Sequence, residues 1–129
     1  MKTPFIPISW GELFDKITIL QIKLENLKYK DALKNVKREY DQLYTIFDKA
    51  FFENTIANQL ITDLKLINER LWNIEDLIRD KERNKVFDKE FINLARQVYI
   101  TNDERSRIKR NINKTFGSEL VEEKSYADY

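Results

Sequence analysis

The chain has 129 residues, of which 35% are charged and only two are glycine and two proline, and its formal net charge is +1. So few turn residues predict an all-α fold, and the length suits one domain that buries a core without disulfides or metals. Cysteine and histidine are both absent, which excludes thiol nucleophiles, disulfides, histidine catalysis and the common zinc sites. The near-zero net charge gives no general attraction to nucleic acid or to an anionic membrane.

The N-terminal region predicts an arm followed by a helix. Residues 1–8 include two prolines and are expected to be extended. Ser9 and Glu12 have the spacing of a capping box, in which each side chain bonds the other's free amide. We therefore predict a helix from about Trp10 to Tyr29. Because apolar residues lie on two sides of this helix, its Asp15 is expected to be partly buried.

A second helix is predicted to begin after Asp31, as its N-cap, and to end within residues 49–54, where the apolar pattern loses its phase. A third is predicted from about Asn54 to Asn84. At 1.5 Å per residue it spans roughly 45 Å, long enough to project beyond its neighbours, so we predict a homodimer built on this helix. Its apolar residues recur in heptad fashion: Ile56, Leu60, Leu64, Ile67, Leu71, Ile74 and Ile78.

The polar residues of this third helix separate into two rows when they are placed at 100° per residue. One row lies opposite the apolar stripe and is interpreted as solvated surface: Glu69, Asn73, Asp76 and Asp80. The other row lies on the flank of the core: Asn68, Trp72, Glu75, Arg79 and Glu82. Glu75 and Arg79 also have the i,i+4 spacing of an ion pair, which stabilises an exposed helix by only about 0.2–0.5 kcal/mol.

The fourth helix is predicted from Asp88, as its N-cap, to about Phe116, with Gly117 as a C-terminal stop. Three polar residues interrupt its apolar face: Asn102, Arg105 and Lys109. Since an unpaired buried charge costs several kcal/mol, these residues require partners, water or a ligand.

Two ways of accommodating the three polar residues stay open. Thr101 and Glu104 repeat the capping-box spacing, so a new helix could begin there and rotate the apolar face. Alternatively, a hairpin that turns at residues 85–86 provides partners on the third helix. In such a hairpin Arg96 lies at the same height along the helices as Glu75, and Asn102 lies at the same height as Asn68 and Glu69.

Residues 118–129 form a short acidic tail after a locally basic segment over residues 103–114. We expect the tail to fold back over this basic helix end; the alternative is an anion site with the tail as its lid. Four helices with short connections predict a single domain over residues 1–129. Its helices form either an antiparallel bundle or two paired helical hairpins.

Four stretches of the chain read "ISWGELFDKITILQIKLE", "INERLWNIEDLIR", "LARQVYITNDERSRIKRNIN" and "GSELVEEKSY". Through them the sequence resembles, nearly end to end, a family of small helical proteins of unknown function from bacteria and bacteriophages. The resemblance implies no reaction. It implies importance for Asp15, Lys16, Asn68, Trp72, Glu75, Asp76, Arg79, Arg96, Asn102, Asp103, Arg105, Lys109, Glu122, Lys124 and Tyr126. For Asp76, which helical geometry places in solvent, we hypothesise a contact between subunits or with the tail.

Two main functions follow. The first is a non-enzymatic helical interaction or scaffold protein that self-associates as a homodimer. The second is a binding protein or enzyme for a phosphate- or carboxylate-bearing small molecule, held in a polar seam between the third and fourth helices. The ligand-binding candidates are Asp15, Lys16, Asn68, Trp72, Glu75, Arg79, Arg96, Asn102, Arg105 and Lys109, with Glu122, Lys124 and Tyr126 in the tail.

Other partners rank lower. Nucleic-acid binding comes last, because the acidic tail adjoins the basic segment. No cofactor is predicted, and only a hard ion such as Mg²⁺ on carboxylates would suit these side chains. No stretch approaches the ~20 apolar residues of a membrane span, so we expect a soluble, cytoplasmic protein.

Overall fold

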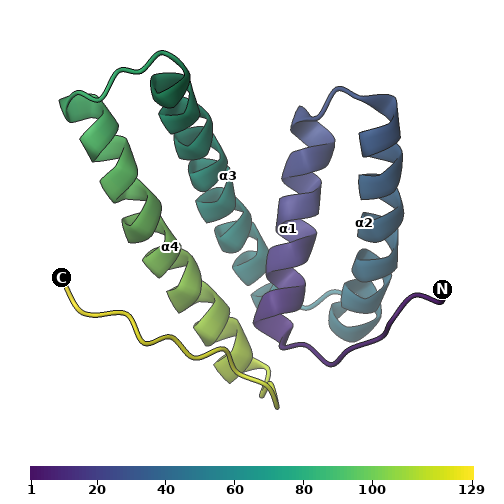
Figure 1. The fold of residues 1–129 in the computed structure, drawn as a ribbon. Helices are drawn as coiled ribbons and strands as arrows, with labels where there is room; N and C mark the ends of the chain where they lie inside the picture. The colour runs from purple at the N-terminus through teal and green to yellow at the C-terminus, as the bar shows by residue number, and fades with distance from the viewer.

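The computed structural model describes residues 1–129 and contains four helices and no strands. They are α1 (Trp10–Asn26), α2 (Lys30–Phe51), α3 (Thr55–Arg83) and α4 (Lys89–Thr115). Figure 1 shows two antiparallel hairpins, α1–α2 and α3–α4, that converge at one end and diverge at the other. The all-α prediction is confirmed, and of its two arrangements the structure has the paired hairpins. No helix combines the length and the apolarity needed to cross a membrane.

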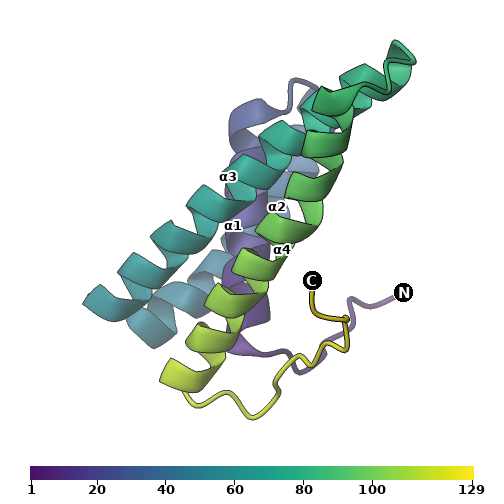
Figure 2. The same cartoon turned by 90° about the vertical axis from the view of Figure 1, so that its left-hand side faces the viewer.

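The hairpins are joined mainly through α1, which packs against each of the other three helices. Figure 2 shows the α3–α4 hairpin crossing in front of the α1–α2 hairpin at an oblique angle. Side chains at the crossing are therefore contributed by α1, α3 and α4, while the far ends of the hairpins stay apart.

The core lies where the hairpins converge. Phe14 of α1 packs against Phe47 and Phe51 of α2, with ring centroids 5.1 and 5.3 Å apart. The ring centroid of Phe116, just after α4, lies 4.5 Å from that of Phe51 and completes this aromatic cluster. The buried residues of the main core are Leu13, Phe14, Ile17, Phe47, Phe51, Ala57, Leu64 and Ile112.

Three helices begin at a residue whose side chain caps the first turn. Ser9, Asn54 and Asp88 each accept a hydrogen bond from the amide three residues further along, at 3.1, 2.9 and 3.0 Å. The predicted caps at Ser9 and Asp88 are thus confirmed. The capping box at Ser9 is only half formed, because the Glu12 carboxylate pairs with Lys109 instead.

Two boundaries differ from the prediction. The N-cap of α2 is Tyr29, which makes no side-chain cap, so the prediction of Asp31 is wrong. Asp31 lies within the first turn, where its charge still interacts favourably with the free amides. Helix α1 ends at Asn26, three residues before the predicted end, because the backbone becomes extended at Leu27.

Helix α4 is continuous from Lys89 to Thr115, so the predicted alternative of a new helix at Thr101 is wrong. Glu104 does not cap this position; its carboxylate lies 3.2 Å from Arg70 of α3. Thr101 is 1% exposed and its hydroxyl has no hydrogen-bond partner. The polar interruption of α4 is therefore accommodated by partners on other elements.

The start of α1 is joined to the end of α4. The amide of Trp10 donates to Ser118 Oγ at 2.8 Å, and the amide of Gly11 donates to Asn113 Oδ1 at 2.7 Å. These bonds satisfy amides that every helix start leaves free. The backbones are so close that a Cβ on Gly11 would lie 2.6 Å from the carbonyl oxygen of Lys109. Only glycine permits this approach.

Candidate functional site

A groove of about 400 Å³ lies between the two hairpins, where α1 faces α3 and α4. Its apolar residues are Ile19, Ile22, Leu71 and Trp72. Its polar residues are Asn68, Glu75, Asp76, Arg79, Asn102 and Arg105. The structure thus gathers six of the predicted site residues on one surface, and the volume falls within the range of about 300–1,000 Å³ found for ligand sites.

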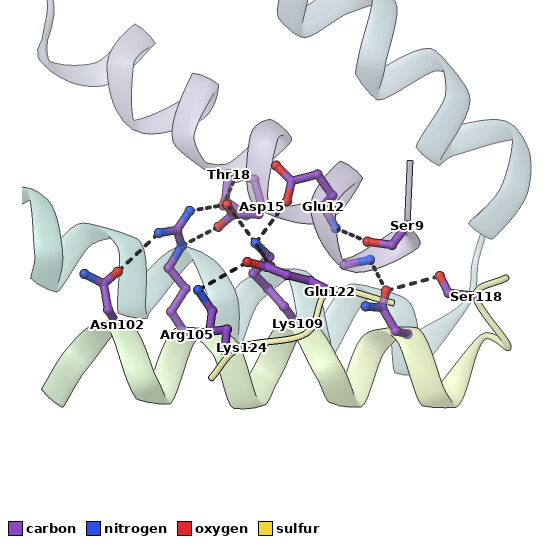
Figure 3. Close-up of polar contacts among 12 residues, drawn as sticks. Ser9, Glu12, Asp15, Thr18, Asn102, Arg105, Lys109, Ser118, Glu122 and Lys124 are labelled. Atoms are coloured by element: carbon purple, nitrogen blue, oxygen red, sulfur yellow. Dashed lines mark hydrogen bonds and ion pairs between the residues drawn. The ribbon is translucent and has the colours of Figure 1, made fainter. Parts of the chain in front are cut away.

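Asp15 is the centre of a polar network behind this groove and is 1% exposed. Its carboxylate accepts hydrogen bonds from Nε of Arg105 at 2.9 Å and from Nη2 of the same guanidinium (Figure 3). It also accepts a hydrogen bond from Asn68 Nδ2 at 2.9 Å. Asn68 also donates to the hydroxyl of Thr18 at 2.9 Å. A two-pronged arginine contact and an amide donor are the partners that allow a carboxylate to stay charged in a protein interior.

Lys109 forms the second half of the network and is 8% exposed. Its Nζ lies 3.0 Å from Glu12, 3.0 Å from Glu122 and 3.8 Å from Asp15. Burial alone lowers the pKa of Lys109, but these carboxylates together raise it above the ordinary lysine value. Lys109 is therefore charged at neutral pH, and it links α1, α4 and the tail.

Arg105 has partners for all three of its side-chain nitrogens. Besides its bonds to Asp15, its Nη1 donates to Asn102 Oδ1 at 3.2 Å. The hydrogen bonds to Asp15 raise the pKa of Arg105, although burial lowers it. An anion entering the groove would have to compete with Asp15 for this guanidinium, so the cation nearest the groove floor is already neutralised.

The rim of the groove is formed by α3. Glu75 and Arg79 form an ion pair within this helix; the Arg79 side chain is exposed and that of Glu75 is half-buried. Asp76 is exposed, lines the groove and makes no ion pair. The side chains of residues 119–129 form hydrogen bonds with Asp103, Lys109 and Arg110 and none with Asp76, so the hypothesis that Asp76 docks the tail is wrong.

Several predicted site residues lie outside this arrangement. Lys16 is exposed and has no ion pair. Arg96 is exposed and does not line the groove, and the expected partner Glu75 pairs with Arg79. The predicted pairing of Arg96 with Glu75 across the α3–α4 hairpin is therefore wrong, because Arg96 lies on the exposed side of α4. Tyr126 is 77% exposed.

Sequence reasoning missed the residues whose partners come from another element. The spacing of Ser9 and Glu12 predicts a capping box, yet the Glu12 carboxylate pairs with Lys109. Asn113 and Ser118, which cap the start of α1, lie more than a hundred residues away along the chain. The only signal in the sequence was the polar interruption of α4, which required partners without naming them.

The tail, residues 118–129, runs along α4 (Figure 2). Glu122 bridges two lysines, Lys109 at 3.0 Å and Lys124 at 3.2 Å, and Glu123 lies 3.1 Å from Arg110. At its end the hydroxyl of Tyr129 donates to Asp103 at 2.5 Å. These contacts are mostly ionic, and the tail residues from 119 onward are exposed.

Acid is expected to release the tail. The hydrogen bond from Lys109, followed by that from Lys124, lowers the pKa of Glu122 below its ordinary value. A carboxylate with a lowered pKa in the folded state stabilises the contact fully above the ordinary glutamate pKa of ~4.3, and this contribution is lost as the pH falls through the lowered value. ¹⁵N relaxation should therefore show residues 119–129 gaining mobility between pH 6 and pH 3. In Glu122→Gln they should already be mobile at pH 6, and a tail equally ordered in that variant would contradict the assignment.

Comparison with known proteins identifies the chain by family. The model of a family of unknown function, DUF6165, matches residues 4–129. The chain belongs to the DUF6165 family. No curated protein and no solved structure matches it. The DUF6165 match therefore covers both hairpins, the groove and the tail, and assigns no chemistry to them.

The arrangement offers little for a bound metal ion. No three carboxylate side chains come together at a spacing that would hold one. The carboxylates of the network, Glu12, Asp15 and Glu122, are instead directed at Lys109 and Arg105. The groove is a surface of apolar side chains and of charges that, except for Asp76, are paired within the chain.

Proposed function

We propose that this protein is a non-enzymatic interaction protein that self-associates as a homodimer through the groove between its hairpins. The observation that carries the proposal is the composition of the groove. Four apolar side chains lie beside charges of both signs, and the cations are already paired with carboxylates of the same chain. Such a surface suits a polypeptide partner better than it suits a free anion, because an anion needs an unpaired cation in the groove.

The exposed surface area of the chain also supports self-association. The surface measures 9624 Å² for a mass of 15.6 kDa, whereas a folded monomer of this mass is expected to expose about 7,200 Å². The extended arm and the tail account for part of the excess, and the diverging hairpins for another part. A standard interface buries about 1,200–2,000 Å² in total, so a dimer through the groove is compatible with this excess.

The rim of α3 is self-complementary in charge. A two-fold axis brings the same surface of both copies together, so that residue i meets residue j and residue j meets residue i. Glu75 and Asp76 lie within one turn of Arg79 on this rim. Two antiparallel copies of α3 would therefore set acidic residues of one copy against the partner's Arg79. Asp76, which has no partner within its own chain, gains one in this arrangement.

Sedimentation equilibrium tests the proposal. The wild-type protein is expected to have twice the mass of 15.6 kDa. Ile19→Glu places a charge on the apolar wall of the groove, outside the main core, and is expected to give a monomer. Ile46→Glu is the matched control, since Ile46 is 50% exposed on α2 and does not line the groove. A monomeric wild type, or an Ile19→Glu variant that stays dimeric, would refute the proposal.

A small polar ligand in the same groove is the second candidate function. The volume of about 400 Å³ favours it, as does the flat indole of Trp72 beside two amide side chains, Asn68 and Asn102. A thermal-shift screen of nucleotides, sugar phosphates and dicarboxylates separates the two functions. A compound at 100 times its dissociation constant would add about 2.7 kcal/mol to the stability. A shift that Trp72→Ala abolishes would favour this candidate over the dimer.

A further inference from the structure

A second, smaller hollow lies between α4 and the tail. It has a volume of about 130 Å³ and is lined by no apolar residue. Its lining residues are Ser106, Arg107, Lys109, Arg110, Asn113, Glu122 and Lys124. Four of the seven are cations, one is a carboxylate, and the other two can donate hydrogen bonds. This hollow shares no residue with the groove between the hairpins.

The one carboxylate in the hollow occupies the position that suits an external anion. Glu122 places one oxygen 3.0 Å from Lys109 Nζ and the other 3.2 Å from Lys124 Nζ (Figure 3). Two cations on two oxygens of one group are also the way in which proteins hold a phosphate. The Glu122 side chain is 44% exposed and belongs to a segment without regular secondary structure. It is therefore a displaceable occupant of the hollow.

The three cations that α4 contributes to the hollow would stay in place if Glu122 moved away, whereas Lys124 belongs to the tail. Lys109 keeps two further carboxylates on α1, Glu12 at 3.0 Å and Asp15 at 3.8 Å, which fix its ammonium group independently of the tail. Arg107 and Ser106 make no ion pair or side-chain hydrogen bond, so their donors are free to take a ligand. The α4 side of the hollow is thus preorganised for an anion, and the tail contributes only Lys124 as a further cation.

From this geometry we infer that the hollow between α4 and the tail binds a phosphate group, and that Glu122 is an internal competitor for the same position. A doubly charged tetrahedral anion makes more charge-assisted hydrogen bonds with these donors than one carboxylate can. Phosphate and the docked carboxylate exclude each other, so the affinity measured in the wild-type protein is the intrinsic affinity reduced by the fraction of molecules in which Glu122 is displaced.

The test is a titration of the full chain with inorganic phosphate at pH 7 and constant ionic strength, followed by ¹H–¹⁵N correlation spectra. Constant ionic strength is required because surface cations are screened by any salt. Saturable shifts are expected around residues 106–113 and 122–124. Glu122→Gln is expected to bind phosphate about tenfold more tightly, as it should if the site is free in only about a tenth of wild-type molecules.

Two further variants make the result specific. Arg107→Gln removes a cation that has no partner in the folded chain, so it should weaken phosphate binding without loss of stability. Glu119→Gln removes an exposed tail carboxylate that makes no ion pair, and it should bind as the wild type does. The inference is overturned if neither the wild type nor Glu122→Gln shows saturable shifts, if chloride produces the same shifts, or if the affinity is equal in wild type, Glu122→Gln and Arg107→Gln. None of these outcomes bears on the dimer.

Discussion

Replacing Asp15 with alanine is expected to lower the free energy of unfolding by about 3–5 kcal/mol, because it leaves the partly buried Arg105 and Lys109 without their shared carboxylate. Asp15 is 1% exposed and also accepts a hydrogen bond from Asn68. Urea unfolding followed by circular dichroism measures the change. Asp48→Ala, which removes an exposed carboxylate without an ion pair, is the matched control and should stay within about 0.5 kcal/mol of wild type.

A double-mutant cycle shows whether this loss comes from the ion pair. If Asp15 and Arg105 act together, the loss in Asp15→Ala plus Arg105→Met should be smaller than the sum of the two single losses, with a coupling of about 0.5–3 kcal/mol. Arg105→Met keeps an apolar stem where the guanidinium stem packs, and it removes the charge that Asp15→Ala would strand. Additive losses would mean that Asp15 stabilises the fold mainly through Asn68 and Lys109.

Gly11→Ala is expected to destabilise the protein by about 1–3 kcal/mol although alanine is the better helix former. The added Cβ would lie 2.6 Å from the Lys109 carbonyl oxygen and 2.9 Å from Asn113 Oδ1. A backbone atom cannot move aside as a flexible side chain can, so α1 and α4 would have to separate. That separation would also weaken the bonds from the amides of Trp10 and Gly11.

Thermal unfolding of Gly11→Ala beside Lys16→Ala measures this effect. Lys16 is exposed on the same helix, so its replacement reports helix propensity alone and should be neutral or slightly stabilising. A Gly11→Ala variant as stable as wild type would show that the contact between α1 and α4 tolerates a methyl group. A lower stability with unchanged helical content would support close packing at this point.

The sequence alone determined the local elements of this protein. The four helices, the caps at Ser9 and Asp88, and the stop at Gly117 follow from interactions within a few residues, which a linear pattern contains. The prediction of Asp31 as a cap is wrong because the start of a helix can shift by a residue or two at little cost in free energy when the neighbouring turn is exposed. The polar interruption of the apolar face of α4 is also visible in the sequence, because polar residues at apolar positions of a helical pattern are recognised without tertiary information.

Only the tertiary structure decided which residues pair with the polar side chains on the apolar face of α4. Pairing between α3 and α4 was available by register, yet Arg105 and Lys109 are held by Asp15 and Glu12 of α1. The choice depends on the angle at which the hairpins cross, and this angle is set by contacts between residues about a hundred positions apart, such as that of Gly11 with α4. Such contacts leave no periodic signal, because each is made once and between elements whose mutual orientation a sequence pattern does not contain.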